Sequence, residues 1–193
     1  MEPRTSDCRG TRDPNGNASD VPYFLSTVTY DGDFLYPVTV TNVLGHVVTR
    51  TYDGRFGKVL TETDPNHRTT HFRYDALGRP LKTWTVYDGS DYPTQSWSYD
   101  SFGIVGAQNV RTDQREVSGA SGVLWKKGYF DGLGREIETR TEGPDNKTVA
   151  VTTQYNPMGK VSRKSLPYFL GVDTPRWVTF DYDVQGRLIR VTQ

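Results

Sequence analysis

Cysteine is nearly absent from this sequence. Cys8 is the single one among 193 residues, and it lies in a polar N-terminal stretch. No disulfide can therefore form within the chain, and if the protein leaves the cell its stability must come from something other than cross-links. No catalytic partner for a Cys8 thiol stands out in the sequence, so we assign this thiol no chemistry.

Long apolar runs and an excess of one charge are also missing. The apolar runs are far shorter than the roughly 20 residues that a membrane-spanning helix needs, so we expect no membrane span. The start, "MEPRTSDCRGTRDPNGNASD", lacks the apolar core of a Sec signal peptide. We therefore expect a protein that is secreted or placed on the cell surface by a non-Sec route, or one that stays cytoplasmic before a complex assembles. Lys plus Arg and Asp plus Glu both number 23, which does not fit a nucleic-acid binder.

Large apolar side chains are scarce in residues 1–20, so this segment is predicted to be a disordered polar leader. From residue 21 the pattern changes to short stretches rich in Val, Thr, Tyr, Phe and Trp between turn signals, such as "YPVTVTN" and "LKTWTVY". These stretches are typical of strands, and no window has helical spacing with caps. Residues 21–193 are thus predicted to be all-β and built from successive antiparallel hairpins.

One phrase recurs through this region: an aromatic residue, Asp or Asn, two variable residues, Gly, and a basic residue. Repetition of this kind indicates a repeat architecture. The well-formed copies comprise Tyr74, Asp75, Gly78 and Arg79; Phe130, Asp131, Gly134 and Arg135; Tyr155, Asn156, Gly159 and Lys160; and Tyr182, Asp183, Gly186 and Arg187. Tyr52, Asp53 and Gly57 form a fifth well-formed copy with one extra residue. Two weaker copies comprise Tyr99, Asp100 and Gly103 without the basic residue, and Thr41, Asn42 and Gly45 without the aromatic.

Each residue type in the phrase has a structural use. The Asp or Asn side chain accepts a hydrogen bond from a backbone N–H two residues on and starts a turn. The Gly takes the left-handed conformation that completes a type I turn with a bulge. The aromatic side chain packs against neighbouring copies, and the acidic and basic residues pair. We therefore interpret the repeated Asp and Arg as turn-formers and ladder residues rather than as catalytic groups.

The phrase resembles the YD repeat of Rhs (rearrangement hotspot) proteins over about residues 21–193. Two longer stretches, 39–66 and 165–188, are similar to the B-type component of bacterial insecticidal toxin complexes and to virulence-plasmid B-like proteins. The resemblance implies a curved or spiral sheet that forms a sector of a hollow shell, and a non-catalytic scaffold that encloses and helps deliver a toxic polypeptide. It also implies protein partners, either further YD-repeat shell segments or toxin-complex subunits.

A second hypothesis is a carbohydrate-binding surface, in which Trp84, Trp97, Trp125 and Trp177 stack on sugar rings and glycans are partners. The competing interpretation is that these aromatics stabilise cross-strand pairs. For metals and cofactors we expect none: His67 and His71 share a strand face but lie about 13 Å apart. We also expect no catalytic residues, because the acid pair Glu136 and Glu138 lies on neighbouring positions of one strand rather than across a cleft.

Overall fold

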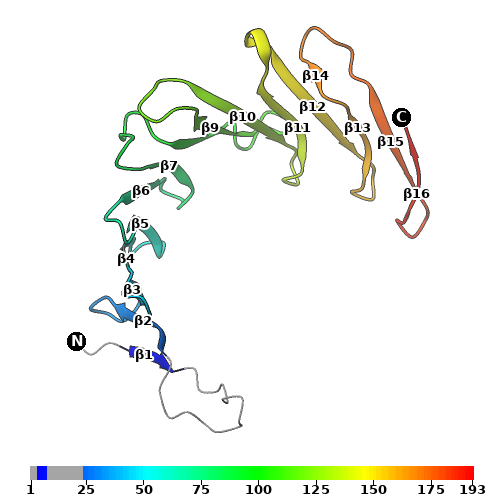
Figure 1. The fold of residues 1–193 in the computed structure, drawn as a ribbon. Coiled ribbons are helices and arrows are strands. Elements are labelled where there is room, and N and C mark those ends of the chain that lie inside the picture. The colour runs from blue at the N-terminus through cyan, green and yellow to red at the C-terminus, as the bar shows by residue number, and fades with distance from the viewer. Residues whose placement is uncertain (1–3, 8–23) are drawn as a thin grey trace, which may run out of the picture. The chain divides into compact units, whose positions relative to one another are not determined.

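The computed structural model describes residues 4–7 and 24–193, and it divides at Thr94 and Gln95 into two compact units. Each unit is an antiparallel sheet in which strands that follow one another along the chain lie side by side (Figure 1). The predicted fold class, all-β with successive antiparallel hairpins, is confirmed. Of the predicted polar leader, Arg4–Asp7 forms strand β1, which pairs with β2. The rest of the leader lies outside the described residues.

The first unit is a run of seven strands in chain order. They are β1 (Arg4–Asp7), β2 (Phe24–Tyr30), β3 (Pro37–Asn42), β4 (Val47–Asp53), β5 (Lys58–Thr63), β6 (Thr69–Tyr74) and β7 (Pro80–Trp84). Its turns alternate between the two ends of the strands, which is what a run of hairpins requires.

The second unit contains the remaining strands and one 3₁₀ turn. They are β8 (Gln95–Asp100), β9 (Asn109–Arg115), β10 (Val123–Phe130), β11 (Glu136–Glu142), η1 (Pro144–Asn146), β12 (Thr148–Tyr155), β13 (Val161–Ser165), β14 (Tyr168–Phe169), β15 (Trp177–Tyr182) and β16 (Leu188–Thr192). The order of strands follows the chain except at β14. This short strand lies in the connection between β13 and β15, and it pairs with β12. The connection from β13 to β15 is therefore an insertion that leaves the hairpin series intact.

A register shift marks the repeat hairpins. In six of them the pairing slips by one residue immediately before an aromatic residue, namely at Tyr30, Tyr52, Tyr74, Phe130, Tyr155 and Tyr182. A bulge at this place twists the hairpin and sets the side chain that follows it at a fixed angle. The predicted turn with a bulge is thus present in these hairpins.

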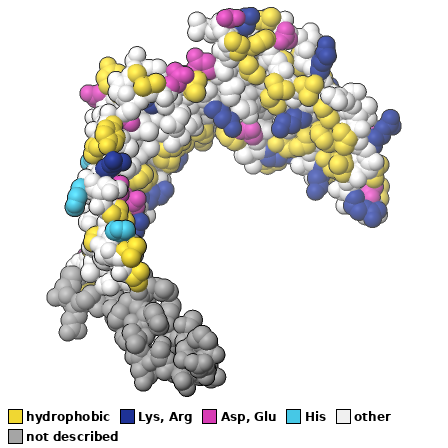
Figure 2. Space-filling model, in the orientation of Figure 1, with side chains coloured by type: hydrophobic (Ala, Val, Ile, Leu, Met, Phe, Trp, Pro, Cys, Tyr) yellow, Lys and Arg dark blue, Asp and Glu magenta, His cyan; other side chains and the backbone are white. Residues whose placement is uncertain are grey.

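Both units are one sheet deep. Among the residues whose side chains are described (26–193), Ala150 is the one apolar side chain that is fully buried. Figure 2 accordingly shows hydrophobic side chains spread over the open surface of both units. Since no second layer covers these strands, cross-strand pairs and turn contacts must supply most of the stability.

The two faces of the first unit differ chemically. One face carries a rank of directly opposed threonines across β2 to β6, and two of the cross-strand pairs on this face join hydroxyls, Thr51 to Thr61 at 2.6 Å and Thr63 to Thr69 at 2.9 Å. The other face carries the aligned Val28, Val40 and Val48. The alternation of strand side chains therefore places the threonine hydroxyls on one face, and this row of valines together with the Arg50–Glu62 ion pair on the other.

Candidate functional site: the repeat turn and its tyrosine

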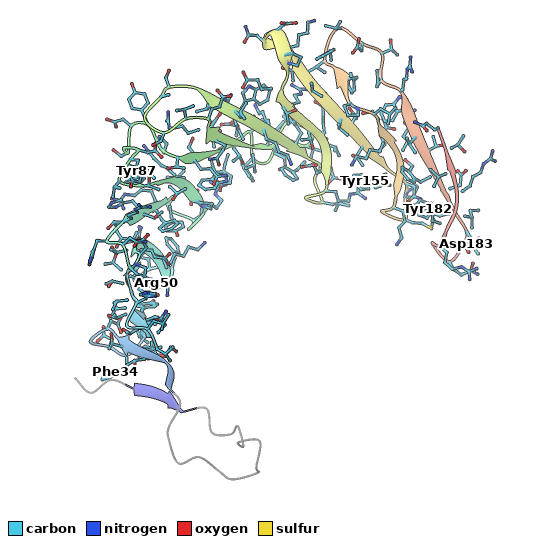
Figure 3. All side chains as sticks on the ribbon, viewed as in Figure 1. Phe34, Arg50, Tyr87, Tyr155, Tyr182 and Asp183 are labelled. Carbon is cyan, nitrogen blue, oxygen red and sulfur yellow. The ribbon has the colours of Figure 1, made fainter. Side chains whose placement is uncertain are left out.

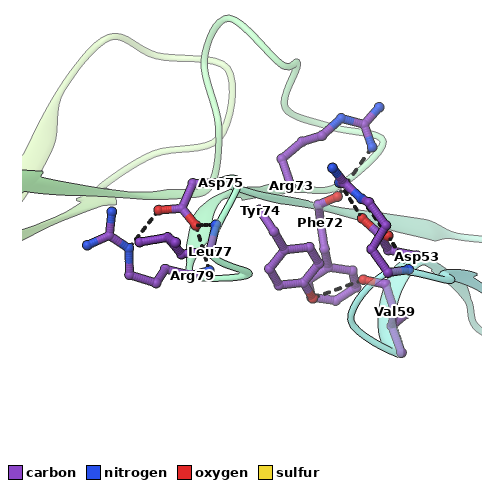
Figure 4. A network of polar contacts seen from close by, with 9 residues as sticks. Asp53, Val59, Phe72, Arg73, Tyr74, Asp75, Leu77 and Arg79 are labelled. Carbon is purple, nitrogen blue, oxygen red and sulfur yellow. Dashed lines mark hydrogen bonds and ion pairs between the residues drawn. The ribbon is translucent and has the colours of Figure 1, made fainter.

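The turn at Asp75 shows how the repeated phrase folds. One oxygen of Asp75, Oδ1, accepts hydrogen bonds from the backbone N–H groups of Leu77 and Arg79, both at 2.8 Å (Figure 4). The backbone N–H of Asp75 donates to the carbonyl of Arg79 at 2.9 Å, and that of Gly78 donates to the carbonyl of Asp75 at 3.0 Å. The Asp side chain therefore takes up donors that no strand partner reaches, and Gly78 supplies the left-handed backbone, with φ at +76°.

The same two acceptor bonds recur at Asp131, Asp183 and Asn42, and one of them at Asn156. Asp131 accepts from Leu133 and Arg135 at 2.9 Å each, and Asp183 accepts from Gln185 and Arg187 at 3.0 and 2.8 Å. Asparagine does the same work in Asn42, whose Oδ1 accepts from the N–H groups of Leu44 and His46, and in Asn156, which accepts from Lys160. Figure 3 places Asp183 at the tip of its hairpin.

The basic residue of the phrase pairs with the acid of its own turn. Arg79, Arg135 and Arg187 each bring a guanidinium nitrogen to within 2.6 to 2.7 Å of the second oxygen of Asp75, Asp131 and Asp183. In the longer copy the basic residue after Gly57 is Lys58, which does not pair with the acid of the turn. Instead, the guanidinium of Arg55, inside the turn, lies 2.7 Å from Asp53. The pairing predicted along the ladder is thus made within each turn.

These contacts set the protonation of the repeated acids. Hydrogen bonds from the Arg135 and Arg187 backbones lower the pKa of Asp131 and Asp183, and the Arg55 side chain does the same for the pKa of Asp53. Burial opposes the shift at Asp75, but the bonds from Arg79 and Leu77 outweigh it, so the pKa of Asp75 is also lowered. A carboxylate held ionised in this way is a poor proton donor or acceptor near neutral pH.

The repeated tyrosine joins one hairpin to the one before it. The Tyr74 hydroxyl donates to the carbonyl of Val59 at 2.9 Å (Figure 4). Tyr52 donates to the carbonyl of Pro37 at 3.0 Å. In the second unit Tyr155 donates to Glu136 at 2.9 Å and Tyr182 donates to Val161 at 3.0 Å. Burial, with a smaller effect of the Asp53 charge, raises the pKa of Tyr74, so its hydroxyl keeps the proton that it donates.

Side chains of the preceding hairpin also cover each turn. Lys58 lies over the Tyr74 ring with its ammonium 5.3 Å from the ring centroid, and Arg135 lies over the Tyr155 ring at 4.5 Å. A Cβ added at Gly78 would lie 3.1 Å from the ring of Phe56. Glycine is therefore needed at position 78 for the close approach of Phe56 as well as for the backbone conformation.

Two further turns have an Asp cap that the phrase does not reveal: Asp64 bonds the second and fourth residues after it, as Asp75 does, and Asp31 bonds the fourth and fifth. Asp31 accepts from the N–H groups of Leu35 and Tyr36, and Asp64 accepts from those of Asn66 and Arg68. Phe34 and His67, with φ at 57° and 62°, occupy the place that Gly takes elsewhere. The repeated phrase identifies neither turn, because both lack its glycine.

A regular step in the first unit could have revealed these turns. The turn-forming side chains stand at positions 31, 42, 53, 64 and 75, one every 11 residues. Successive members lie at opposite ends of the strands, so Asn42 and Asp64 belong to the end away from Asp53 and Asp75. The tyrosines of the repeated phrase accordingly precede every second one of these turns.

Two copies depart from the common arrangement. After Tyr99 the strand pairing continues one residue further, because Asp100 still pairs with Asn109, and a longer loop of residues 101–108 replaces the short turn of the phrase. Phe130 has no hydroxyl, and its hairpin is joined to the preceding loop by hydrogen bonds that Gln108 makes with the backbones of Phe130 and Asp131. Phe130 differs from the phrase at the position that would supply the hydroxyl, whereas the copy at Tyr99 differs in the length of the connection that follows it.

The tryptophans are half-buried in the sheet rather than open to a ligand. Arg73 lies over the Trp84 ring, Arg111 over that of Trp125 and Arg163 over that of Trp177, at 5.3, 5.3 and 4.3 Å. His71 stacks on Trp84 with ring centroids 5.0 Å apart. Trp97, on β8, is half-buried as well. The structure thus gives no support to the sugar-stacking hypothesis.

Metal-ligand clusters and membrane-spanning helices are two features that the described part of the chain does not show. Within residues 4–7 and 24–193, no three His, Cys, Asp or Glu side chains gather as metal ligands would. Among the described residues, no helix has the length and apolar character that a membrane crossing requires. A pocket in the second unit is lined by Val151, Lys164, Ser165, Leu166, Pro167, Val178 and Phe180, and this lining includes no carboxylate or imidazole.

Comparisons with known proteins agree with this architecture. The model of the RHS Repeat family matches residues 55–91, which contain the turns at Asp64 and Asp75. No curated protein matches the sequence. This match covers one stretch of the repeats, over which the sequence is similar to the RHS Repeat family.

Solved structures with the same fold belong to Tc toxin components. The structure of TcdB2-TccC3-TEV superimposes with a TM-score of 0.72 at 14% identity and covers 98% of this chain and 15% of that one. TcdB2-TccC3 gives 0.71 at 16% identity, with 98% and 12% covered. A Tc holotoxin pore of Photorhabdus luminescens that carries a TccC3 mutation gives 0.71 at 14% identity, with 91% and 14% covered. The chain therefore spans only 12 to 15% of the length of the chains that it resembles.

Proposed function

We propose that this chain is a non-catalytic structural segment of a shell that encloses a toxic polypeptide and helps to deliver it. The observation that carries the proposal is the Tyr-to-carbonyl bond, which recurs in both units and in four places joins a hairpin to the one before it. A series of hairpins joined in this way can be extended by adding further copies, as in other repeat proteins. The fold match of nearly the whole chain to a small part of much longer Tc toxin chains supports the same view.

The chemistry of the repeats supports a role without turnover. The acids of the phrase are used as turn acceptors and are held ionised by their arginines. Partners of the chain would then be further YD-repeat segments or other toxin-complex subunits. Export by a non-Sec route, or assembly in the cytoplasm before release, remains a prediction from the sequence.

The proposal can be tested by expressing the chain together with the reading frames beside its gene. We expect a hollow particle by electron microscopy that contains this chain and an enclosed polypeptide resistant to added protease until the particle is opened with denaturant. Purification of the chain in a particle whose other polypeptides are digested as fast as the free proteins would contradict enclosure. A variant with Gly78→Ala and Gly134→Ala, which strains two turns, should make the enclosed polypeptide more accessible to the protease.

A further inference from the structure

The sheet of the second unit opens where the insertion between β13 and β15 begins. On the side away from β11, strand β12 pairs with β14 up to Ala150 and with β13 from Thr153 on. Val151 and Thr152 fall between these two pairings. The backbone N–H of Thr152 donates instead to the hydroxyl of Ser165 at 2.8 Å. The opening is therefore a built feature of the sheet, because a buried side chain satisfies the donor that the ladder leaves.

A mostly apolar hollow of about 360 Å³ lies at this opening. Val178 is directly opposite Lys164, and Phe180 follows two residues later, so strand alternation places these three side chains on one face. The pairing of β13 with β15 continues past the strands, because the N–H of Leu166 donates to the carbonyl of Arg176 at 2.8 Å. We call this hollow the insertion pocket, and its lining consists of Val151, Lys164, Ser165, Leu166, Pro167, Val178 and Phe180. Its size is typical of sites for small molecules.

The insertion, residues 166–176, is tied to the sheet beside the insertion pocket. The hydroxyls of Tyr168 on β14 and Thr152 on β12 are joined by a hydrogen bond of 3.0 Å. A second hollow of about 750 Å³ lies against the insertion, and its lining shares Leu166 and Pro167 with the insertion pocket. Insertions into a repeat series commonly form its binding surface. The place where this chain departs from its hairpin series is therefore also the place where it forms a pocket.

The charged residues that line the two hollows are two cations and one acid. Lys164 lines the insertion pocket, whereas Arg176 and Asp173 line the second hollow. A carboxylate oxygen of Asp173 already accepts the N–H of Phe169 at 3.0 Å. Among the described residues, no carboxylate forms an ion pair with Lys164 or with Arg176, and both side chains are exposed. They are diagonal neighbours, about 7–8 Å apart along the sheet, so both long side chains can reach one anion.

We propose that the insertion pocket binds a small carboxylic acid with an apolar body. The apolar body covers Val151, Val178 and Phe180, and the carboxylate lies between Lys164 and Arg176. A guanidinium presents paired donors that match a carboxylate, and two cations without a counterion favour an anion over a neutral ligand of the same shape. This inference goes beyond the shell proposal and does not depend on it, because the site lies within one unit of a single chain.

The first test is a titration of the full chain with octanoate, followed by the amide signals in NMR spectra. Saturable shifts should appear in β12, β13 and β15 around the insertion pocket, and the signals of β9 and β10 should stay in place. A ligand of about ten heavy atoms should have a dissociation constant in roughly the millimolar range or below. Octanamide has the same chain without the charge, so it should bind about tenfold more weakly. Acetate has the charge without the apolar body and should give no saturable shift.

A second test uses variants that separate the two parts of the site. Lys164→Gln/Arg176→Gln should weaken octanoate binding to the level of octanamide and leave octanamide binding as in the wild type. The matched control Lys160→Gln/Arg190→Gln removes the same charges outside the pocket and should bind octanoate like the wild type. Val178→Phe, which fills the hollow, should weaken the binding of both ligands. The spectrum of each free variant checks that the sheet is intact.

Several results would overturn the proposal. They are the absence of saturable shifts with octanoate, shifts spread evenly over both units, equal binding of octanoate and octanamide by the wild type, and wild-type affinity for octanoate in the variant Lys164→Gln/Arg176→Gln. The last comparison is made at equal net charge with the control variant, so a general effect of charge on the chain would appear in both.

Discussion

At the scale of single residues, the cap and the basic residue of the phrase vary together. Turns capped by Asp75, Asp131 or Asp183 have Arg in the basic position, whereas Asn42 and Asn156 are followed by His46 and Lys160. A guanidinium presents paired donors that match a carboxylate, and an amide oxygen has no charge to pair. The backbone bonds are the same in both kinds of turn, so the ion pair is an addition to the turn rather than its basis.

The glycine of the phrase provides a test of two separate costs. Gly45 and Gly78 have nearly equal φ values of +78° and +76°, but only Gly78 faces a neighbour, the Phe56 ring. Gly45→Ala should cost about 1 kcal/mol for the left-handed backbone alone. Gly78→Ala should cost more, because its methyl group would also press on Phe56. Equal losses of stability in chemical denaturation, or no recovery of Gly78→Ala by a second change of Phe56→Ala, would contradict this account.

The acids of the turns also predict how stability depends on pH. The folded pKa values of Asp53, Asp75, Asp131 and Asp183 are lowered. Their contribution is thus fully present above the unfolded value of about 4 and is lost as pH falls through the folded values. The denaturation midpoint should hold steady from neutral pH to about pH 5 and then drop. In the variant Asp75→Asn/Asp131→Asn/Asp183→Asn this drop should be smaller, and an unchanged acid profile would exclude these groups as its cause.

At the scale of elements, the tyrosine decides whether adjacent hairpins act together. Tyr74→Phe keeps the ring under Lys58 and removes only the hydroxyl bond to Val59, so it should cost about 0.5–1.5 kcal/mol. Tyr74→Ala also removes the ring and should cost clearly more. Amide exchange should quicken in β5 and β6 with either change. Faster exchange in β6 alone would show that the hydroxyl does not join the two hairpins.

The elements were largely predictable from the sequence, and the contacts between them were not. Asp75 and Gly78 reveal their turn because both bonds are made within six residues of chain. The carbonyl that Tyr74 reaches belongs to Val59, 15 residues earlier, and its identity depends on how two hairpins are aligned. The turns at Phe34 and His67 escape a pattern based on glycine, since the surrounding hydrogen bonds hold those residues in a conformation that their own preferences disfavour. Strand β14 lacks any periodic signal because it has only two residues.

At the scale of the whole molecule, stability should be local rather than global. Each unit is one layer deep. Among its described residues, each unit has at most one apolar side chain that is fully buried. Contacts between strands follow the order of the chain, with β14 as the exception. In such a structure the free energy of unfolding is close to a sum of hairpin terms and terms between neighbouring hairpins.

Local stability leads to a prediction for damage at a distance. Gly78→Ala in the first unit should speed amide exchange in β5, β6 and β7, and the protection of β10, β11 and β12 in the second unit should stay as in the wild type. Gly134→Ala should give the reverse pattern, so each variant is the control for the other. Hydrogen exchange read by mass spectrometry can follow both units in one sample. A uniform loss of protection across residues 24–193 would show that the two units unfold as one cooperative body, and the additive description would then fail.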